Sequence, residues 1–420
     1  MHSLNSLSLT DFGEALSKVV FPSQAVRSEQ FLKGREAQLR GIKEAAFSPG
    51  RQVFIHGLTG VGKTSLALTA AYTLQSSDAE PIYISCDEDS TVYSTIRTIA
   101  EIGKGIRPNI LSSGQTIGAA GSGFLMQANE QDGRFPVPMN IPETIQALQS
   151  AIPGYSRNPI IIIDEVNKFP ESEKVRVSEL IRGLSEAQLP GKVIFCGIGD
   201  TLDELLETDR QTYRFLHAVE LSRLDFSSLR DILESALKNF SVQTDDTTAW
   251  RICRISDGFP NFVHLLAEKC LWALYRSIHE QPIMSETTLT PSHFIGGVRG
   301  AIGSVEQELV HDYDKSVKKY DTNSHLILAA VADDHELERQ IVHIFESYRR
   351  ICSNNEIADI LSETQFRSRV YNLCKSDYGE ILRKGTNKGY YQFSKHRMRG
   401  YARLRAQERG IDLFPDHPLG

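Results

Sequence analysis

Short apolar runs alternate with helical patterns between residues 51 and 224. The runs are rich in β-branched residues and read QVFIHG, PIYISC, PIIIIDE, KVIFCG and AVELSRL. Near-continuous apolar runs are typical of strands buried on both faces, and their alternation with helices indicates βαβ units. The pattern therefore predicts an α/β fold with a mostly parallel sheet. Helices are expected between the strands at residues 64–74, 91–102, 142–151 and 172–186.

One segment interrupts this alternation. Residues 103–139 are rich in Gly, Ser, Gln and Asn and separate the second predicted strand from the third. A loop of this length in a compact domain is either functional or disordered. Two interpretations stay open, a loop or hairpin at an assembly surface and an inert insertion.

The second half of the chain is predominantly helical. Helical patterns cover residues 225–278 and, after a polar stretch, a helix that starts near residue 291 and reaches residue 309 and a further block at residues 325–350. A short helix (NEIADIL), a turn, a second helix (QFRSRVYNLCK), a hairpin and a basic helix are expected to follow. No internal repeat is evident, so a repeat array is not expected.

The composition is that of a soluble globular protein. With 420 residues the chain is expected to form two or three domains, and 40% apolar and 24% charged residues suffice for a sizeable core. The six cysteines form no C-x-x-C pair, which argues against a disulfide framework or a zinc knuckle. No basic segment precedes an apolar run at the start, and the aliphatic runs, such as residues 160–163, are far too short for a membrane span. We expect a cytoplasmic protein without a membrane span.

Charge is distributed unevenly. The net charge is −7, yet residues 365–409 hold 12 Lys and Arg against 3 Asp and Glu. This segment therefore carries +9 and the rest of the chain −16. Such asymmetry predicts an anionic partner for the C-terminal end. A solvated basic face without a partner is the alternative.

The sequence GLTGVGKTS ends the first apolar run and opens the first predicted helix. Its glycines, lysine and threonine have the spacing of a phosphate-binding loop, in which backbone N–H groups and a helix N-terminus surround phosphates. We predict that Lys63 pairs with the β- and γ-phosphates and that the hydroxyl of Thr64 binds Mg²⁺. The predicted nucleotide-binding residues of the loop are Gly57, Gly60, Val61, Gly62, Lys63, Thr64 and Ser65.

A second motif, IIIIDE, lies about 100 residues further on. Its four isoleucines predict a buried strand that ends in Asp164 and Glu165. A carboxylate at this end of a strand beside a phosphate loop can hold Mg²⁺, which is the predicted role of Asp164. Its neighbour Glu165 is the candidate general base that polarises the attacking water. The alternative is a strand that ends in a solvated acidic turn.

Together these motifs resemble those of AAA+ ATPases, with residues 57–65 similar to the Walker A motif and residues 160–165 to the Walker B motif. More narrowly, the chain resembles the branch that contains origin-recognition and archaeal initiator ATPases, STAND signalling NTPases and bacterial transposition-type ATPases. FLKGREAQL is similar to the initiator box ahead of the phosphate loop, which implies that Arg35 helps to seat the adenine. SDGFPNFVHLL resembles the G-x-P start of a lid helix, which implies that Pro260 and Asn261 face the nucleotide.

The resemblance implies a P-loop AAA+ fold, with a three-layer αβα core, a helical lid and a C-terminal winged-helix domain. Specific motifs carry this resemblance over residues 20–275. After residue 275 only the predicted order of helices and strands carries it. The implied domains are an N-terminal extension (1–30), the nucleotide-binding core (31–224), the lid (225–290), a linker helix (291–325), a winged-helix-like basic domain (326–411) and a tail (412–420).

Two positions depart from the family pattern. The fourth strand is followed by Gly199 where initiators carry a polar sensor residue, so its neighbour Asp200 is the candidate sensor. Many AAA+ lids carry an arginine after the G-x-P proline, but this chain has Asn261. Because an uncharged amide stabilises developing negative charge less than an arginine does, we expect slow ATP hydrolysis, suited to a switch rather than a motor.

The segment DRQTYRFLHAVEL precedes the last strand of the predicted sheet. In AAA+ rings this region faces the nucleotide of the neighbouring subunit, and an arginine supplied from there raises the hydrolysis rate by several orders of magnitude. Arg214 lies closer to the strand and is the first candidate for this catalytic role, with Arg210 as the second. A surface arginine on an amphipathic helix is the alternative.

The basic segment reads as a helix–turn–helix followed by a basic hairpin, which favours a winged helix that binds duplex DNA. The predicted helix at 365–375 has an apolar stripe and an opposite face of types suited to phosphate and base-edge contacts. A winged helix used for protein contacts is the alternative, and the last basic helix has only a thin apolar face for an anionic membrane. The candidate DNA-binding residues are Arg367, Tyr371, Lys375, Arg383, Lys384 and Lys388.

The leading hypothesis is an ATP- and Mg²⁺-dependent AAA+ switch that assembles into a homo-oligomeric ring or filament and acts on DNA. The rival is a STAND-like signalling or defence NTPase whose C-terminal domain binds protein. The missing lid arginine favours the rival, whereas the basic tail favours the first hypothesis. A P-loop small-molecule kinase would leave Arg35, the lid and the tail unexplained.

Overall fold

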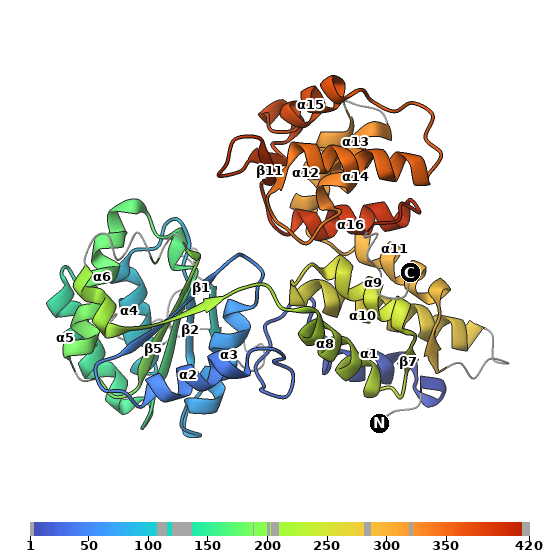
Figure 1. The fold of residues 1–420 in the computed structure, drawn as a ribbon. Coiled ribbons are helices and arrows are strands. Elements are labelled where there is room, and N and C mark those ends of the chain that lie inside the picture. The colour runs from blue at the N-terminus through green and yellow to red at the C-terminus, as the bar shows by residue number, and fades with distance from the viewer. Residues whose placement is uncertain are drawn as a thin grey trace. The chain divides into compact units, whose positions relative to one another are not determined.

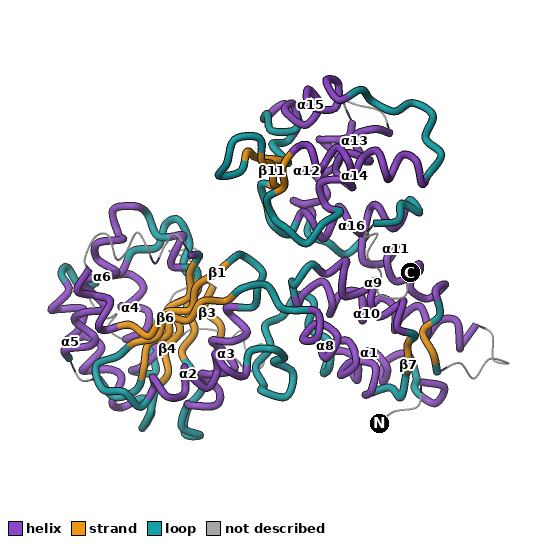
Figure 2. Tube along the Cα trace, viewed as in Figure 1, coloured by secondary structure: helices purple, strands orange, loops and turns teal. Residues whose placement is uncertain are grey.

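The computed structural model describes residues 4–106, 116–119, 137–187, 189–199, 202, 210–280, 287–318 and 322–413. The chain divides into two compact units (Figure 1). One unit is Gln24–Ser222, and the other combines Met1–Ser23 with Arg223–Gly420. The first is an α/β unit and the second is predominantly helical (Figure 2).

The α/β unit is built on a six-stranded sheet with the strand order β3-β2-β4-β5-β1-β6. Five of these strands pair in parallel, and β3 pairs antiparallel with β2 at the edge. The prediction of an α/β fold with a mostly parallel sheet is confirmed. The strands are β1 (Gln52–Gly57), β2 (Ile82–Ser85), β3 (Thr116–Ala119), β4 (Ile160–Asp164), β5 (Lys192–Gly197) and β6 (Leu216–Leu221).

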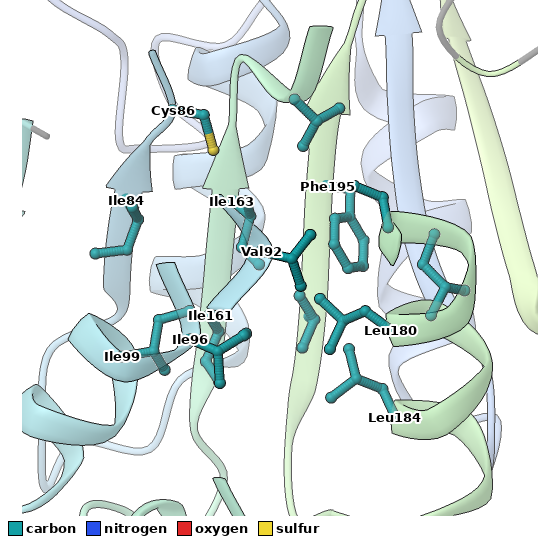
Figure 3. Packing of buried hydrophobic residues seen from close by; sticks show 14 of the residues in the cluster. Ile84, Cys86, Val92, Ile96, Ile99, Ile161, Ile163, Leu180, Leu184 and Phe195 are labelled. Atoms are coloured by element: carbon teal, nitrogen blue, oxygen red, sulfur yellow. The ribbon is translucent and has the colours of Figure 1, made fainter. Parts of the chain in front are cut away.

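Helices cover both faces of this sheet, which explains the continuous apolar runs. The helices are α2 (Glu36–Ala46), α3 (Lys63–Leu74), α4 (Val92–Gly103), α5 (Ile141–Ala151) and α6 (Lys174–Glu186), with short 3-10 turns at Ile152–Gly154, Val166–Lys168, Glu171–Glu173 and Arg210–Phe215. Figure 3 shows α4 and α6 packing their buried side chains onto alternate residues of the strands, among them Ile161 and Ile163. All five residues of β4 are buried, because helices cover this strand on both sides.

Local signals set the helix starts in this unit. The N-terminus of α4 carries a capping box, in which the Thr91 hydroxyl accepts from the Ser94 N–H and the Ser94 hydroxyl accepts from the Thr91 N–H. At α5, the side chain of Asn140 accepts from the N–H of Glu143, and a proline stands in the first turn. The four predicted helices, α3 to α6, start within two residues of their predicted starts, whereas α2 was not predicted.

The segment 103–139 lies mostly outside the described residues. Its residues Thr116–Ala119 form the edge strand β3, which the hydrophobic pattern did not predict. The interpretations of this segment as an assembly surface or as an inert insertion therefore both stay open.

The second unit begins with a 3-10 turn (Leu4–Ser6) and α1 (Leu9–Ser17), which pack against α10. The ring of Phe12 stacks on Tyr275 with 4.4 Å between centroids and meets Trp272 edge-on at 4.7 Å. Small two- and three-stranded sheets complete this unit. Its helices are α8 (Phe226–Lys238), α9 (Asp246–Ser256), α10 (Pro260–Glu280), α11 (Pro291–Ile302), α12 (Gln307–Lys318), α13 (Thr322–Ala332), α14 (Ile341–Asn354), α15 (Glu363–Asn372) and α16 (Met398–Glu408). Its strands are β7 (Gln243–Thr244) with β8 (Thr288–Leu289), and β10 (Leu382–Lys384), β11 (Tyr390–Phe393) and β9 (Arg339–Gln340).

One helix prediction in this unit is wrong. The sequence NEIADIL at residues 355–361 is a loop rather than a helix. The preceding helix α14 ends here, because Glu356 adopts the left-handed conformation (φ 52°) and the Ile357 N–H donates back to the Cys352 carbonyl. The neighbouring prediction is confirmed with shifted bounds: α15 starts at Glu363, after a capping box between Ser362 and Gln365.

The last basic helix, α16, is part of the core. Its apolar residues Met398, Tyr401 and Leu404 are buried, so they form no face for a membrane. Arg399 and Arg403 are buried as well, and both form ion pairs with Oδ1 of Asp257, at 2.6 and 2.9 Å. No helix in the described part of the chain is long and apolar enough to cross a membrane.

Candidate nucleotide-binding site

The phosphate-binding loop lies between β1 and α3, as predicted. Gly57, Gly60 and Gly62 have φ values of 146°, 90° and 100°, which L side chains rarely adopt. At Gly57 a Cβ would also lie 2.2 Å from the carbonyl oxygen of Leu221 on β6. The loop backbone therefore requires glycine at these places, and α3 begins directly after it at Lys63. Its N-terminus is a suitable binding site for phosphate.

Lys63 is held inside the loop. Its Nζ donates to the carbonyl oxygens of Gly57 and Leu58, each at 3.1 Å. Burial lowers the pKa of Lys63, and the nearby charges of Glu165 and Asp164 oppose this shift. A partly desolvated ammonium group in such a loop interacts more strongly with phosphate oxygens than one in bulk water does.

Asp164 and Thr64 meet at the end of β4. The hydroxyl of Thr64 donates to Oδ2 of Asp164 at 2.6 Å, although the two residues are 100 positions apart. Asp164 is 2% exposed, and its other carboxylate oxygen accepts the backbone N–H of Glu165 at 2.8 Å. Burial raises the pKa of Asp164, and the hydrogen bonds oppose this shift. A hydroxyl and a carboxylate at this distance form the oxygen-rich donor set that Mg²⁺ prefers, so the residues fit such an ion.

Glu165 follows Asp164 in the left-handed conformation, with φ 58° and ψ 37°. This sharp change of direction ends β4 and leads into the turn Val166–Lys168. Its side chain is partly exposed and lies 3.7 Å from Nζ of Lys168. The carboxylate thus adjoins the buried Asp164 but keeps access to solvent, as a base that activates water requires.

Arg35 and Ser65 connect the loop to its surroundings. Arg35 is buried, and its Nη2 donates to the carbonyl oxygens of Val61 in the loop, at 3.1 Å, and of Ser222, at 2.6 Å. The hydroxyl of Ser65 accepts the backbone N–H of Val26 at 3.1 Å. The contact with Ser222 was not predicted from the sequence, because 187 residues separate the two. The adenine-seating role of Arg35 stays a prediction.

Tyr83 is a residue of this site that the sequence reasoning missed. Its hydroxyl donates to Oδ2 of Asp164 at 3.0 Å from the neighbouring strand β2. Burial, followed by the charge of Asp164, raises the pKa of Tyr83. The available signal was a tyrosine inside the apolar run PIYISC, since a buried tyrosine hydroxyl needs a hydrogen-bond partner.

The other predicted site residues belong to the turn before β6 or to the helical unit, or lie outside the described residues. Arg214 is exposed in the turn before β6, with its guanidinium 4.7 Å from the ring centre of Phe215. Asp200 and the side chain of Arg210 lie outside the described residues. Pro260 begins α10 in the helical unit, and the buried Oδ1 of the next residue, Asn261, has no hydrogen-bond partner among the described residues.

The candidate DNA-binding residues lie on α15 and on the hairpin β10–β11. Tyr371 is 48% exposed, and the ammonium groups of Lys375 and Lys384 lie 4.8 and 5.5 Å from its ring centre. Lys388 is exposed in the turn of the hairpin. By contrast, Arg367 donates to the carboxylate of Glu363 on the same helix at 2.6 Å. The exposed cations thus gather around one aromatic ring.

Several other cations of the basic segment are buried or paired with acids, so the segment carries less free charge than the sequence suggested. Arg383 donates to Oε1 of Gln392 at 3.3 Å. Lys395 bonds to Glu308 and Asp312, and Arg397 bonds to Glu306. With Arg399 and Arg403 buried, the +9 of this segment is not all on the surface.

A family model and several solved structures are similar to this chain. Residues 48–206 match a family model described as "AAA domain". Among solved structures, the chain is similar to a Walker-type ATPase of Pyrococcus abyssi, with TM-score 0.50 and 13% identity over 91% of this chain and 99% of that one. It also matches the ORC1 protein of Aeropyrum pernix in complex with DNA, with TM-score 0.46 and 16% identity over 90% and 93%. A third match is Cdc6p of Pyrobaculum aerophilum, with TM-score 0.44 and 15% identity over 94% and 99%.

A comparison with curated protein sequences gave no match. The identities to the solved structures are low, so these likenesses concern the fold alone. The family match covers both the loop at Gly57 and the carboxylates at Asp164 and Glu165. Residues 48–206 therefore form an AAA domain, and the chain is a P-loop ATPase of the AAA+ fold.

Proposed function

We propose that this ATPase is a slow, ATP-driven oligomerisation switch that acts on duplex DNA through a C-terminal winged helix. The observation that carries the ATP-dependent part is the contact between Thr64 and Asp164, which joins the phosphate loop to the end of β4. The observation that supports the DNA-dependent part is the exposed group of Tyr371, Lys375 and Lys384.

In the proposed reaction each residue has a separate task. Lys63 and the loop N–H groups bind the β- and γ-phosphates, while Thr64 and Asp164 hold Mg²⁺. When bound, the ion neutralises charge on the phosphates. Glu165 orients and polarises the attacking water, which its partial exposure allows. We further propose that Arg35 seats the adenine and that Asp200 acts as the sensor.

The proposed switch-like behaviour depends on two positions, Asn261, where many AAA+ lids carry an arginine, and Arg214. Asn261 brings no charge to the start of α10, so the subunit alone lacks one stabiliser of the transition state. Arg214 is exposed and forms no ion pair with an acid among the residues that the structure describes, so it is available to a neighbouring subunit. Assembly would then set the hydrolysis rate.

The order of elements supports a winged helix. After α13 come β9, α14, α15 and the hairpin β10–β11, and β9 pairs with β11 to close a small sheet. In this arrangement α15 is the recognition helix and the hairpin is the wing. The cations around Tyr371 lie on both elements, so helix and wing would contact DNA together.

The first experiment tests the shared active site. Glu165→Gln should bind ATP without turnover, and Arg214→Ala should bind ATP but hydrolyse it poorly. Mixing the two variants should restore turnover, because the Glu165→Gln subunit supplies Arg214 to the intact site of its neighbour. No recovery in the mixture would refute the action in trans, and full activity of Glu165→Gln would refute the assigned base.

The second experiment tests DNA binding. The affinity for a fluorescent duplex should fall with salt, and replacement of Lys375, Lys384 and Lys388 by Gln should reduce the slope by about 2.7, at about 0.9 for each lost phosphate contact. Lys395→Gln is the matched control, because its charge is already bound by Glu308 and Asp312. An unchanged slope in the triple variant would favour the STAND-like alternative, in which this domain binds protein.

A further inference from the structure

Three hydrogen-bond donors converge on the carboxylate of Asp164. The hydroxyls of Thr64 and Tyr83 both donate to Oδ2, at 2.6 and 3.0 Å, and the N–H of Glu165 donates to Oδ1 at 2.8 Å. The site described above uses Thr64 and Glu165 but gives Tyr83 no task. A partly buried tyrosine hydroxyl that donates to the acid of the active site needs an explanation.

Tyr83 differs from the other side-chain donor in how it is held. Thr64 belongs to the first turn of α3, beside the phosphates, and its oxygen is itself a ligand for Mg²⁺. Tyr83 belongs to β2, which pairs in parallel with β4 so that Tyr83 lies opposite Ile162. The sheet therefore fixes the distance between Tyr83 and Asp164, whatever happens in the phosphate loop.

This bond has a directional consequence. The Tyr83 hydroxyl carries one hydrogen, and Oδ2 of an ionised carboxylate can accept it while the remaining lone pairs stay available. The bond fixes the rotation of the carboxylate about its Cβ–Cγ bond, and thereby the direction of those lone pairs. Groups that orient a metal ligand in this way affect metal affinity without touching the metal.

We propose that Tyr83 is a positioning residue that orients the Asp164 carboxylate for Mg²⁺–nucleotide. The inference rests on the proposed role of Thr64 and Asp164 as the ligands of Mg²⁺. Tyr83 contacts neither nucleotide nor metal and acts only through Asp164.

The test is Tyr83→Phe, which keeps the buried ring and removes the hydroxyl. A fluorescent ATP analogue is bound to the full chain, and Mg²⁺ is titrated against the binding signal. The Mg²⁺ concentration at half-saturation should rise about tenfold, as is typical when a partner of a metal ligand is lost. Binding of the analogue in EDTA should stay the same, because the loop itself is intact.

Tyr155→Phe is the matched control. It also removes a tyrosine hydroxyl of the same unit, one that donates to the Glu80 carbonyl at 2.7 Å away from Asp164. The Mg²⁺ dependence of this variant should equal that of the unchanged protein. Thermal unfolding of both variants checks that they are folded to the same degree.

Two results would overturn the inference. One is an unchanged Mg²⁺ dependence in Tyr83→Phe, with or without a loss of stability, since a purely structural tyrosine behaves in this way. The other is an equal weakening of binding in EDTA, which would place the effect on the loop rather than on the metal ligand. If the unchanged protein bound no ATP analogue at all, the proposed function would fail first and this inference with it.

Discussion

The buried cluster around Asp257 gives the sharpest test of what stabilises the helical unit. Oδ1 of Asp257 accepts from Arg223 at 2.7 Å and from Arg399 at 2.6 Å, and it forms an ion pair with Arg403 at 2.9 Å. The Asp257 side chain is 3% exposed, so water cannot replace these bonds. Burial lowers the pKa of Arg403 to about 9, and the charge of Asp257 opposes this shift. One carboxylate thus supports three guanidinium groups.

Asp257→Asn should destabilise this unit by about 3–5 kcal/mol, because breaking a buried ion pair leaves its partner charges uncompensated. The amide has nearly the shape of the carboxylate. Asp257 has φ 56°, and asparagine tolerates this left-handed conformation as well as aspartate does. The expected loss is therefore electrostatic rather than steric.

Urea unfolding followed by tryptophan fluorescence measures this effect selectively. The chain has two tryptophans, Trp250 and Trp272, and both lie in the helical unit. Asp246→Asn is the control, since Asp246 is 63% exposed in its ion pair with Arg230 and should contribute at most about 1 kcal/mol. A loss below about 1 kcal/mol in Asp257→Asn, or one equal to the control, would refute the assigned role of the cluster.

Three other perturbations test single residues. Burial lowers the pKa of His264 to about 4, so as the pH falls below 6.5 the unfolded chain binds a proton that the folded chain does not. The free energy of unfolding should therefore fall by up to about 3 kcal/mol between pH 6.5 and 4, and His264→Leu should remove this fall. Identical dependence of the urea midpoint on pH in the variant and in the unchanged protein would contradict this. Gly57→Ala should lower the thermal midpoint and abolish nucleotide binding, whereas Gly154→Ala, where a Cβ meets nothing within 4 Å, should do neither. Arg35→Ala should lower the free energy of unfolding of the α/β unit by about 2 kcal/mol in the absence of nucleotide, because the carbonyls of Val61 and Ser222 lose a charged donor. If the variant changed only the affinity for ATP, Arg35 would be purely an adenine contact.

Local patterns in the sequence were sufficient for the α/β core and for most of the site. The isoleucines of β4 could be read as a doubly buried strand because each of them is apolar, whatever packs against it. The phosphate loop was recognisable because its glycines, Lys63 and Thr64 act within nine consecutive residues. The contact of Thr64 with Asp164 could be anticipated from the sequence. The phosphate loop follows β1 and Asp164 ends β4, and the carboxyl ends of parallel strands meet at the same edge of a sheet.

Tertiary structure alone decided which charges and hydroxyls meet. Arg399 and Arg403 were counted in the +9 charge of the basic segment, yet they pair with an aspartate 142 and 146 positions earlier in the chain. Tyr83 looked like one more strand residue until β2 was placed beside β4. The loop at 355–361 has an apolar spacing that suits a helix, but the left-handed Glu356 ends α14 before it.

The difference has a physical cause. Strands, helices and the phosphate loop depend on side chains that are neighbours in sequence, so a window of about twelve to fifteen residues is enough to predict each of them. Burial of a charge depends on a partner that the fold brings from far away, and composition does not reveal whether such a partner exists. The sequence thus determined the loop between β1 and α3 that is predicted to bind phosphate, and the folded structure decided which arginines and tyrosines contact the loop and its carboxylates, which lie in the core and which stay at the surface.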